Sequence, residues 1–540
     1  MIFLCAIIIL LICGLILRYI EETREFQQLG YYMGQYARHS KITSLHGDHV
    51  FFYGSLIAAC FASDVSFVIS DIGLYVSLAF AAVHLLFQIL IYRGLKPKHP
   101  LAYTMRIKRL LATVTVLILL ASFGILYGTV GYFGLLFIWI FMGFAFLFAP
   151  LMLLLANIVN RPMERAINNR YYREAKQCVE NAPFLKIAAI TGSFGKTSIK
   201  NILGDMLKYD FNTVVPPSSF NTKLGLTKVI RAELIPTTQV FIAEMGAKKI
   251  GEISETTQML TPDVSLITTV VGQHLETFGS IENIIREKSE VYRALKPGST
   301  AIINYDDRKM MQVAVPEGVH KLYISTKATP YAPSMYVEEV HVGGSGSRFV
   351  IVDNRDAEHV VRIPVKTSLL GEHNIFNILA SAAMALTLGA KVTSIVTAAE
   401  NLVPVKNRLS TRVERGITIL EDAFNSNPVG AKAALDVLSL MDTDKRVIIT
   451  PGMIELGDDE KEIHMEFGKQ IAQVCDEVVL VTKKRTIHIY EGLKNSGYDM
   501  SKVTIVSGMR DALKMIHRIC KAGDTVLIEN DLPDVFEEVA

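Results

Sequence analysis

The sequence predicts a multi-domain protein in which an N-terminal α-helical transmembrane bundle precedes two α/β domains. Two patterns lead to this prediction. Residues 1–157 contain nearly all the long apolar runs of the 540-residue chain. After them, short β-branched runs alternate with helical stretches, which is typical of mostly parallel sheets. We therefore expect a membrane region at 1–160 and two α/β domains at 161–408 and 409–540.

Five apolar segments make up the membrane region, and each has about the ~20 residues that a helix needs to cross the hydrocarbon core. They are residues 2–18, 50–69, 71–92, 110–130 and 132–157. The first has neither a basic stretch before it nor a small-residue cleavage site, so we interpret it as a retained anchor and not as a signal peptide.

The basic residues predict how these segments are oriented. Lysine and arginine are concentrated in the stretches 19–49 and 93–109, and the positive-inside rule assigns both stretches to the cytoplasm. Five crossings then put the N-terminus outside and the α/β domains in the cytoplasm. The prediction is a multi-pass protein of the cell (inner) membrane, in contact with membrane lipid.

Composition excludes several classes of site and partner. The formal net charge is +2, which does not favour a nucleic-acid partner. The 6 cysteines show no C-x-x-C spacing and several lie in apolar segments, so we expect neither a disulfide framework nor a zinc site.

The strands of the α/β part follow a mixed, helical link at 161–186. In the first domain we predict strands at 185–190, 213–215, 239–244, 265–270 and 300–303. Residues 320–365 change to alternating strand patterns, and we interpret the glycine–serine cluster at 343–347 as a hairpin turn because no helix follows it. In the second domain we predict strands at 417–421, 446–450, 477–481, 503–506 and 525–528.

A glycine loop follows the first of these strands and has the sequence Thr191-Gly192-Ser193-Phe194-Gly195-Lys196-Thr197-Ser198. Between a buried strand and a helix expected at 199–207, such a loop points backbone N–H groups at nucleotide phosphates. Lys196 would meet the β- and γ-phosphates, and Thr197 would hold Mg²⁺. The full Walker spacing has a glycine where this chain has Ile190, so the loop is a shortened variant. The sequence predicts binding of ATP or GTP.

Two residues at the ends of neighbouring predicted strands could bind a second Mg²⁺. Glu244 ends the strand at 239–244, and His274 follows the strand at 265–270. Open α/β sheets bind ligands at this carboxyl edge. Mg²⁺ usually prefers oxygen ligands and a lone histidine is more often structural, so position alone leaves both interpretations open.

Further motifs follow along both α/β domains. In the first α/β domain they are Ser219-Phe220-Asn221, Glu244-Met245-Gly246, His274-Leu275-Glu276, Lys288 and Gly371-Glu372-His373-Asn374. In the second they are Asn407-Arg408-Leu409, Asp422 to Pro428 and Gly452 to Gly457. With the glycine loop, their order and spacing resemble the Mur ligase family, most closely its branch that adds D-alanyl-D-alanine to the peptidoglycan precursor. The likeness covers roughly residues 185–530.

The resemblance implies a P-loop ATPase domain of the Mur ligase central type and a Rossmann-like C-terminal domain. It also implies an ATP-dependent amide ligase in which a carboxylate takes the γ-phosphate and an amine then displaces phosphate from the acyl phosphate.

The residue roles that the resemblance implies fall into three groups. Nucleotide contacts are implied for Gly192, Ser193, Phe194, Gly195, Lys196, Thr197, Ser198, Asn374, Arg408 and Asp422, with Asn374 at the adenine. Two Mg²⁺ ions are implied at Thr197, Glu244, His274 and Lys288, the last as a carbamylated lysine. Catalytic roles are implied for Lys196, His274, Lys288 and Arg408.

Two departures from the family affect the expected substrates. A membrane region stands where the family has its UDP-sugar-binding domain, and Glu529-Asn530-Asp531 replaces the Lys-Gly-Ser expected after the last strand. We therefore expect a carboxylate acceptor that is a cell-envelope precursor, lipid-linked or close to the membrane, and an amino acid or dipeptide as the amine.

Two other functions remain open at this point. One is a membrane regulator that binds nucleotide without ligase chemistry, and the other is a ligase of the poly-γ-glutamate type. A regulator has no need of Glu244, His274 and Lys288, so the presence of all three favours a ligase.

Overall fold

The computed structural model describes residues 2–40, 100–128, 144–217, 220–272, 275–327, 333–406, 408–423, 426–454 and 456–532, and a few isolated positions between 82 and 141. The chain divides into two compact units, Met1–Ile167 with Pro533–Glu537, and Asn168–Leu532 with Glu538–Ala540. The division falls inside the long helix α7 (Ala149–Glu180), which carries Pro162. The domain limits expected from the sequence remain predictions.

The first unit is helical where it is described. Its helices are α1 (Ile2–Gln28), α2 (Met33–His39), α5 (Met105–Gly128) and the first part of α7. Apolar side chains of all four share one core, which includes Leu15, Tyr36, Val114 and Leu153. The four helices therefore pack together as a bundle.

One helix of this unit has the length and apolarity needed to cross a membrane. Among the described residues it is Met105–Ile125, of which 17% is buried. The predicted crossings at 50–69 and 71–92 lie almost wholly outside the described residues, and so does part of the one at 132–157. The described helices do not support a multi-pass topology, which stays a proposal.

The second unit begins with a nine-stranded sheet in the order β2-β3-β1-β4-β5-β6-β7-β8-β9. Strands β1 to β7 pair in parallel, and β8 and β9 extend the sheet in antiparallel orientation. The bounds are β1 (Lys186–Thr191), β2 (Thr213–Val214), β3 (Val240–Glu244), β4 (Val264–Ile267), β5 (Thr300–Asn304), β6 (His320–Ser325), β7 (Met335–Gly343), β8 (Gly346–Asp353) and β9 (Val361–Thr367).

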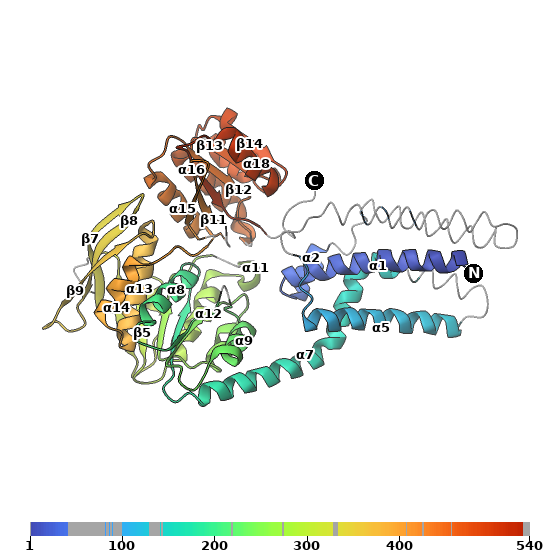
Figure 1. Cartoon of the computed structure of the whole chain (residues 1–540), viewed down its shortest axis with the longest axis horizontal. Coiled ribbons are helices and arrows are strands. Elements are labelled where there is room, and N and C mark those ends of the chain that lie inside the picture. Colours follow the sequence, from blue (N-terminus) through green and yellow to red (C-terminus); the bar gives the residue numbers. More distant parts are fainter. Residues whose placement is uncertain are drawn as a thin grey trace. The chain divides into compact units, whose positions relative to one another are not determined.

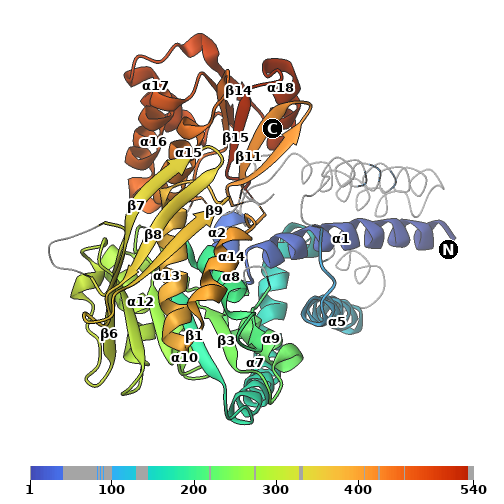
Figure 2. The same cartoon turned by 60° about the vertical axis from the view of Figure 1, so that its left-hand side comes forward.

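Helices cover both faces of this sheet (Figures 1 and 2). On one face lie α8 (Lys196–Leu207), α13 (Glu372–Leu388) and α14 (Val392–Glu400), and on the other α9 (Lys223–Glu233), α10 (Glu252–Thr257), α11 (Leu275–Phe278) and α12 (Ile281–Arg293). The short helix η1 (Met310–Gln312) follows β5. Because the central strands are buried on both faces, they are apolar at nearly every position.

The five strands predicted for this part of the chain are confirmed within a few residues as β1 to β5. The predicted helix begins earlier than expected, at Lys196, because Gly195 adopts a left-handed conformation (φ 82°) and starts the helix there. The predicted hairpin turn is also confirmed. It joins β7 to β8 at Gly346, where φ is 133° and a Cβ would lie 2.2 Å from the carbonyl oxygen of Thr367.

A second sheet follows, in the order β10-β11-β15-β12-β13-β14. All neighbours pair in parallel except β10 and β11. The bounds are β10 (Ser410–Glu414), β11 (Ile417–Asp422), β12 (Arg446–Thr450), β13 (Glu477–Val481), β14 (Val503–Val506) and β15 (Thr525–Glu529). The five strands predicted for this domain are confirmed, whereas β10 was missed.

The helices of this domain also lie on both faces of its sheet. Helices α15 (Pro428–Leu440), α16 (Glu460–Val474) and α17 (Ile487–Asn495) share one apolar core, and α18 (Met509–Ile519) packs on the other face. Two short helices, η2 (Gly457–Asp459) and η3 (Met500–Lys502), complete it. A mostly parallel sheet between two helical layers has the doubly wound architecture of Rossmann-like domains.

Candidate active site

The predicted glycine loop joins β1 to α8 at the carboxyl edge of the first sheet. Gly192 has φ 143°, and a Cβ on it would come 1.9 Å from Oγ1 of Thr268. Gly195 has φ 82°, and a Cβ there would come 2.7 Å from Oδ1 of Asn377. Only glycine avoids both the strain and the close contacts, so these two residues allow the backbone to take this path.

Hydrogen bonds to the segment after β4 fix the loop. Oγ1 of Thr268 donates to the carbonyl oxygen of Phe194 at 2.6 Å, and the N–H of Ser193 donates to the carbonyl oxygen of Thr269 at 2.8 Å. Ser198, with Lys196 and Thr197, forms the first turn of α8. The N–H groups of a first turn have no partner within their own helix, so this turn presents donors to an anion.

Two lysine side chains converge on one carbonyl oxygen of the loop. Nζ of Lys196 donates to the oxygen of Gly192 at 2.6 Å, and Nζ of Lys288, from α12, donates to the same oxygen at 2.9 Å. Burial, with Arg408 nearby, lowers the pKa of Lys196 to about 8. Burial and the charge of Lys196 lower the pKa of Lys288 well below its usual range. An anion beside both amines would relieve this repulsion, which suits a nucleotide phosphate.

Glu244 lies at the end of β3, next to the first turn of α8. Its Oε1 accepts hydrogen bonds from Oγ1 of Thr197 at 3.0 Å and from Nδ2 of Asn221 at 3.1 Å. Its Oε2 lies 3.2 Å from Nζ of Lys200, and both of these side chains are buried. The sequence analysis did not select Lys200 or Asn221 as site residues.

The oxygens of Glu244 and Thr197 are suited to bind one of the predicted magnesium ions. Oε2 of Glu244 is buried without a well-formed hydrogen bond in the described part of the chain. The carboxylate and the Thr197 hydroxyl are hard oxygen donors 3.0 Å apart, which fits Mg²⁺. His274 lies outside the described residues. Among the residues that are described, no group of three or more His, Cys, Asp or Glu side chains could hold a metal ion.

Arg408 connects the loop to the second domain. Its Nη2 donates to Oγ1 of Thr197 at 3.3 Å. It is also close enough to Asp422, at the end of β11, for the two charges to interact. Burial nevertheless raises the pKa of Asp422 to about 6. The structure thus brings both predicted junction residues toward the phosphate loop.

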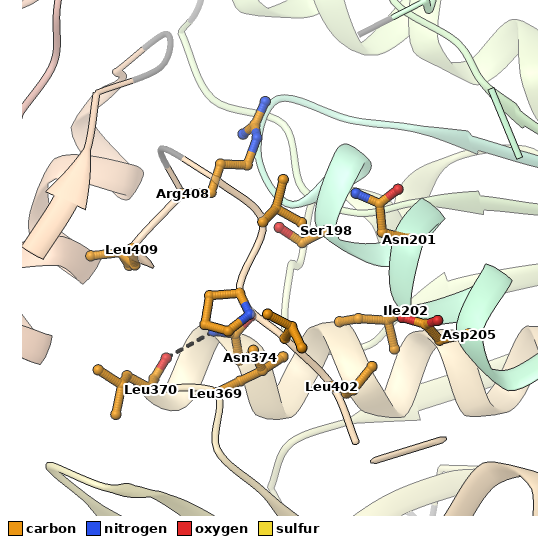
Figure 3. A pocket seen from close by; sticks show the side chains of 13 residues that line it. Ser198, Asn201, Ile202, Asp205, Leu369, Leu370, Asn374, Leu402, Arg408 and Leu409 are labelled. Carbon is orange, nitrogen blue, oxygen red and sulfur yellow. Dashed lines mark hydrogen bonds between the residues drawn. The ribbon is translucent and has the colours of Figure 1, made fainter. Parts of the chain in front are cut away.

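A pocket lies beside this junction (Figure 3). Asn374 lines it, as do Ser198, Asn201 and Asp205 of α8. Its aliphatic walls are Ile202, Leu369, Leu370, Leu402, Val403, Pro404, Val405 and Leu409. Asn374 donates from Nδ2 to the carbonyl oxygen of Leu370 at 2.8 Å and accepts from Asn377 at 2.9 Å. An amide has two donor hydrogens and two acceptor lone pairs, so one of each remains for the paired donor and acceptor of an adenine edge.

Phe194 places an aromatic ring in the loop. The ring meets His373 edge-on, with centroids 5.7 Å apart. It also lies against Gly430 of α15, where a Cβ would come 3.1 Å from the ring. Burial lowers the pKa of His373 to about 4, so this imidazole is neutral at pH 7. Phe194 therefore packs between the two domains and presents no polar group to a phosphate.

The segment Glu529-Asn530-Asp531 lies at the carboxyl edge of the second sheet. The side chain of Glu529 is buried and accepts hydrogen bonds from Ser426 and, at 2.7 Å, from Oγ1 of Thr450. Burial raises its pKa to about 7. Asn530 donates to the carbonyl oxygen of Gly452 at 2.7 Å. The acidic residue is thus bonded within the domain.

Two family models match the part of the chain that forms these domains. The Mur ligase middle domain matches residues 190–385, and the Mur ligase, glutamate ligase domain matches residues 407–529. The chain belongs to the Mur ligase family. Both matches lie beyond the first unit, which neither Mur ligase model covers.

Two Mur ligases with similar sequences share one name. The UDP-N-acetylmuramoyl-tripeptide–D-alanyl-D-alanine ligase of Haemophilus influenzae is 30% identical over 293 residues, which are 53% of this chain and 61% of that protein. The ligase of the same name from Escherichia coli is 29% identical over 303 residues, which are 55% of this chain and 65% of that protein. The chain therefore spans less than two thirds of the length of these relatives.

Solved Mur ligase structures share the fold of the second unit. The crystal structure of MurF from Acinetobacter baumannii has a TM-score of 0.59 and 25% identity, over 67% of this chain and 77% of that one. The MurF ligase of Thermotoga maritima, in complex with ADP, has a TM-score of 0.59 and 23% identity, over 67% of this chain and 80% of that one.

Proposed function

We propose that the protein is an ATP-dependent amide ligase that joins a carboxylate to an amine through an acyl phosphate. The observation that carries the proposal is the convergence of Lys196, Lys288 and Arg408 on the glycine loop, beside the paired oxygens of Thr197 and Glu244. The positive charges of Lys196 and Arg408 at a helix N-terminus favour a polyphosphate, and a neighbouring carboxylate favours its metal ion.

The reaction transfers a phosphoryl group and then forms the amide bond. A carboxylate oxygen of the acceptor attacks the γ-phosphorus, and the bond to the bridging oxygen of ADP breaks. The amine nitrogen then attacks the acyl carbon, phosphate leaves, and the proton of the amine passes to a base or to water. Lys196 and the first-turn N–H groups of α8 would bind the phosphates, and Arg408 would reach the transferred group from the domain junction.

Thr197 and Glu244 are the described residues that would hold Mg²⁺, and His274 is proposed as a further ligand. The ion would supply positive charge where phosphate charge develops. The pocket beside Asn374 would receive the adenine base. Its aliphatic walls suit the flat faces of a purine.

Lys288 is proposed to act as a carbamate. A neutral amine is the form that attacks CO₂, and the burial that lowers the pKa of Lys288 favours that form. The new N–C bond forms as a proton leaves the nitrogen, and the neutral amine becomes a carbamate, whose anionic oxygens can bind a metal ion. The proposal is supported by the position of the Lys288 amine, which is buried and lies 2.9 Å from the Gly192 oxygen of the phosphate loop.

For the substrates, we propose a muramyl-peptide-type cell-envelope precursor, lipid-linked or close to the membrane, and an amino acid or dipeptide. The names of the similar ligases support this substrate class. The apolar helix Met105–Ile125 supports attachment to the membrane. We retain as a proposal the multi-pass arrangement with cytoplasmic catalytic domains.

The test is acceptor-dependent phosphate release by the full chain, purified in detergent with ATP, Mg²⁺ and candidate acceptors and amines. We expect release only when both substrates are present, and none from Lys196→Ala. Nucleotide binding without turnover for any acceptor would favour the regulator over the ligase. Equal turnover in Lys196→Ala would contradict the nucleotide site itself.

A further inference from the structure

Two lysines stand one helical turn apart at the start of α8, and they meet different partners. Nζ of Lys196 donates to the carbonyl oxygen of Gly192 at 2.6 Å. Nζ of Lys200 lies 3.2 Å from Oε2 of Glu244, and the two side chains are 0% and 1% exposed. The two ammonium groups therefore contact different parts of one site, the glycine loop and the carboxylate of Glu244.

Stability alone does not explain the pair of Lys200 and Glu244. Removing two charges from water usually costs more free energy than their attraction returns, so two well-packed apolar side chains would join α8 to β3 at least as well. Other inward positions of this helix are apolar, among them Ile199, Ile202 and Leu203. A lysine among these apolar residues indicates that the positive charge of Lys200 serves the function of Glu244.

The carboxylate of Glu244 is held at both oxygens. Oε1 accepts from Thr197 and Asn221, and Oε2 faces the ammonium of Lys200. Among the described residues, Lys196 and Arg408 also lie close enough to Glu244 for their charges to interact with it. While Oε2 faces the ammonium of Lys200, Oε1 accepts the hydrogen bond of the Thr197 hydroxyl.

We propose that Lys200 is a positioning residue that orients Glu244, so that the carboxylate and the Thr197 hydroxyl present their oxygens together to the metal ion of the nucleotide. The inference rests on the nucleotide site proposed above. Lys200 touches neither the metal nor the phosphates, and it acts through Glu244.

The test measures binding and does not require turnover. ADP is titrated calorimetrically into the full chain in detergent, once with Mg²⁺ and once with EDTA. The ratio of the two affinities is the metal enhancement. We expect Lys200→Met to reduce this enhancement by about 10- to 100-fold, the usual loss when a side chain that orients a metal ligand is removed. Affinity in EDTA should change little, and Lys200→Arg should restore part of the enhancement.

A matched control and a double variant complete the design. Lys208, at the other end of the same helix, pairs with Asp205 at the surface, so Lys208→Met should leave the enhancement unchanged. In a Glu244→Gln background, Lys200→Met should have no further effect, because the group through which it acts is already altered. This comparison also decides the matter if the single Lys200→Met variant fails to fold.

Several outcomes would overturn the inference. They are an unchanged enhancement in Lys200→Met, an equal loss of affinity in EDTA, a further loss in the double variant, or failure of the double variant to fold. Wild-type protein whose nucleotide binding does not depend on Mg²⁺ would overturn this inference and the metal site together. Binding with Mg²⁺ but without acceptor-dependent phosphate release would overturn the ligase alone.

Discussion

Substitution of Lys288 distinguishes a carbamate from an ammonium group at the phosphate loop. The side chain is 6% exposed, and its amine donates to the carbonyl oxygen of Gly192 at 2.9 Å. Lys288→Ala removes the nitrogen. Lys288→Arg keeps a positive charge but cannot form a carbamate with CO₂. If the carbamate is the working form, both variants should lose activity.

The size of the effect follows from the contacts. In Lys288→Ala the lost hydrogen bond is worth about 0.5–1.5 kcal/mol of folding free energy. Two features of the site offset it: Gly192 keeps its bond to Lys196, and one ammonium fewer is buried beside another. Turnover should fall much further, by roughly 10²–10³, as when one group that stabilises transition-state charge is removed.

The assay is phosphate release in buffers of controlled bicarbonate, with thermal unfolding measured on the same samples. Acetate or formate should partly restore Lys288→Ala, because a small carboxylate can occupy the vacated position. Wild-type activity in Lys288→Arg would refute the carbamate in favour of the ammonium group. Wild-type activity in Lys288→Ala would remove the lysine from the mechanism, and an activity loss matched by unfolding would make its role structural.

Three further predictions concern the loop, the domain junction and the membrane region. Gly195→Ala should lower the free energy of unfolding by about 1–3 kcal/mol and weaken ADP binding, because φ is 82° and the new Cβ meets Asn377; unchanged values of both in calorimetry would contradict the loop argument. Burial raises the pKa of Asp422 to about 6, so this group's contribution to stability falls as the pH rises from about 4 to 6. Asp422→Asn should therefore flatten the dependence of the unfolding temperature on pH in this range. The same pH dependence in the variant and the wild type would refute the role of Asp422. A single cysteine in the 93–109 loop of a cysteine-free variant should resist an impermeant thiol reagent in intact cells while one at the N-terminus is labelled, and the reverse pattern would place the catalytic domains away from ATP.

The sequence was most informative where the structure depends on residues that are close together along the chain. The glycine loop could be predicted because Gly192, Gly195 and Lys196 are close together and their spacing has a local meaning. The strands were found because parallel strands buried on both faces are apolar throughout. Strand β10 was missed because its side chains are half-buried or exposed and form no apolar run.

The unpredicted parts of the site depend on which strands become neighbours. Lys200 meets Glu244 only because β3 pairs with β1, whose loop leads into α8. Thr268 reaches the loop because β4 lies on the other side of β1. A lysine one turn after Lys196 on an apolar helix face was a local signal for a buried partner, but the sequence does not say which carboxylate it meets.

The balance of charge at the loop links nucleotide binding to the stability of the whole second unit. Lys196, Lys200 and Arg408 lie close enough to the carboxylate of Glu244 for their charges to interact with it, and burial lowers the pKa of these three groups and of Lys288. A bound polyphosphate would supply negative charge beside these buried groups. A ligand that binds only the folded state stabilises it by an amount that grows with concentration over Kd, about 2.7 kcal/mol at a hundredfold excess. Because Arg408 lies at the junction of the two domains and bonds to Thr197, that gain is expected to extend from the loop to the second domain.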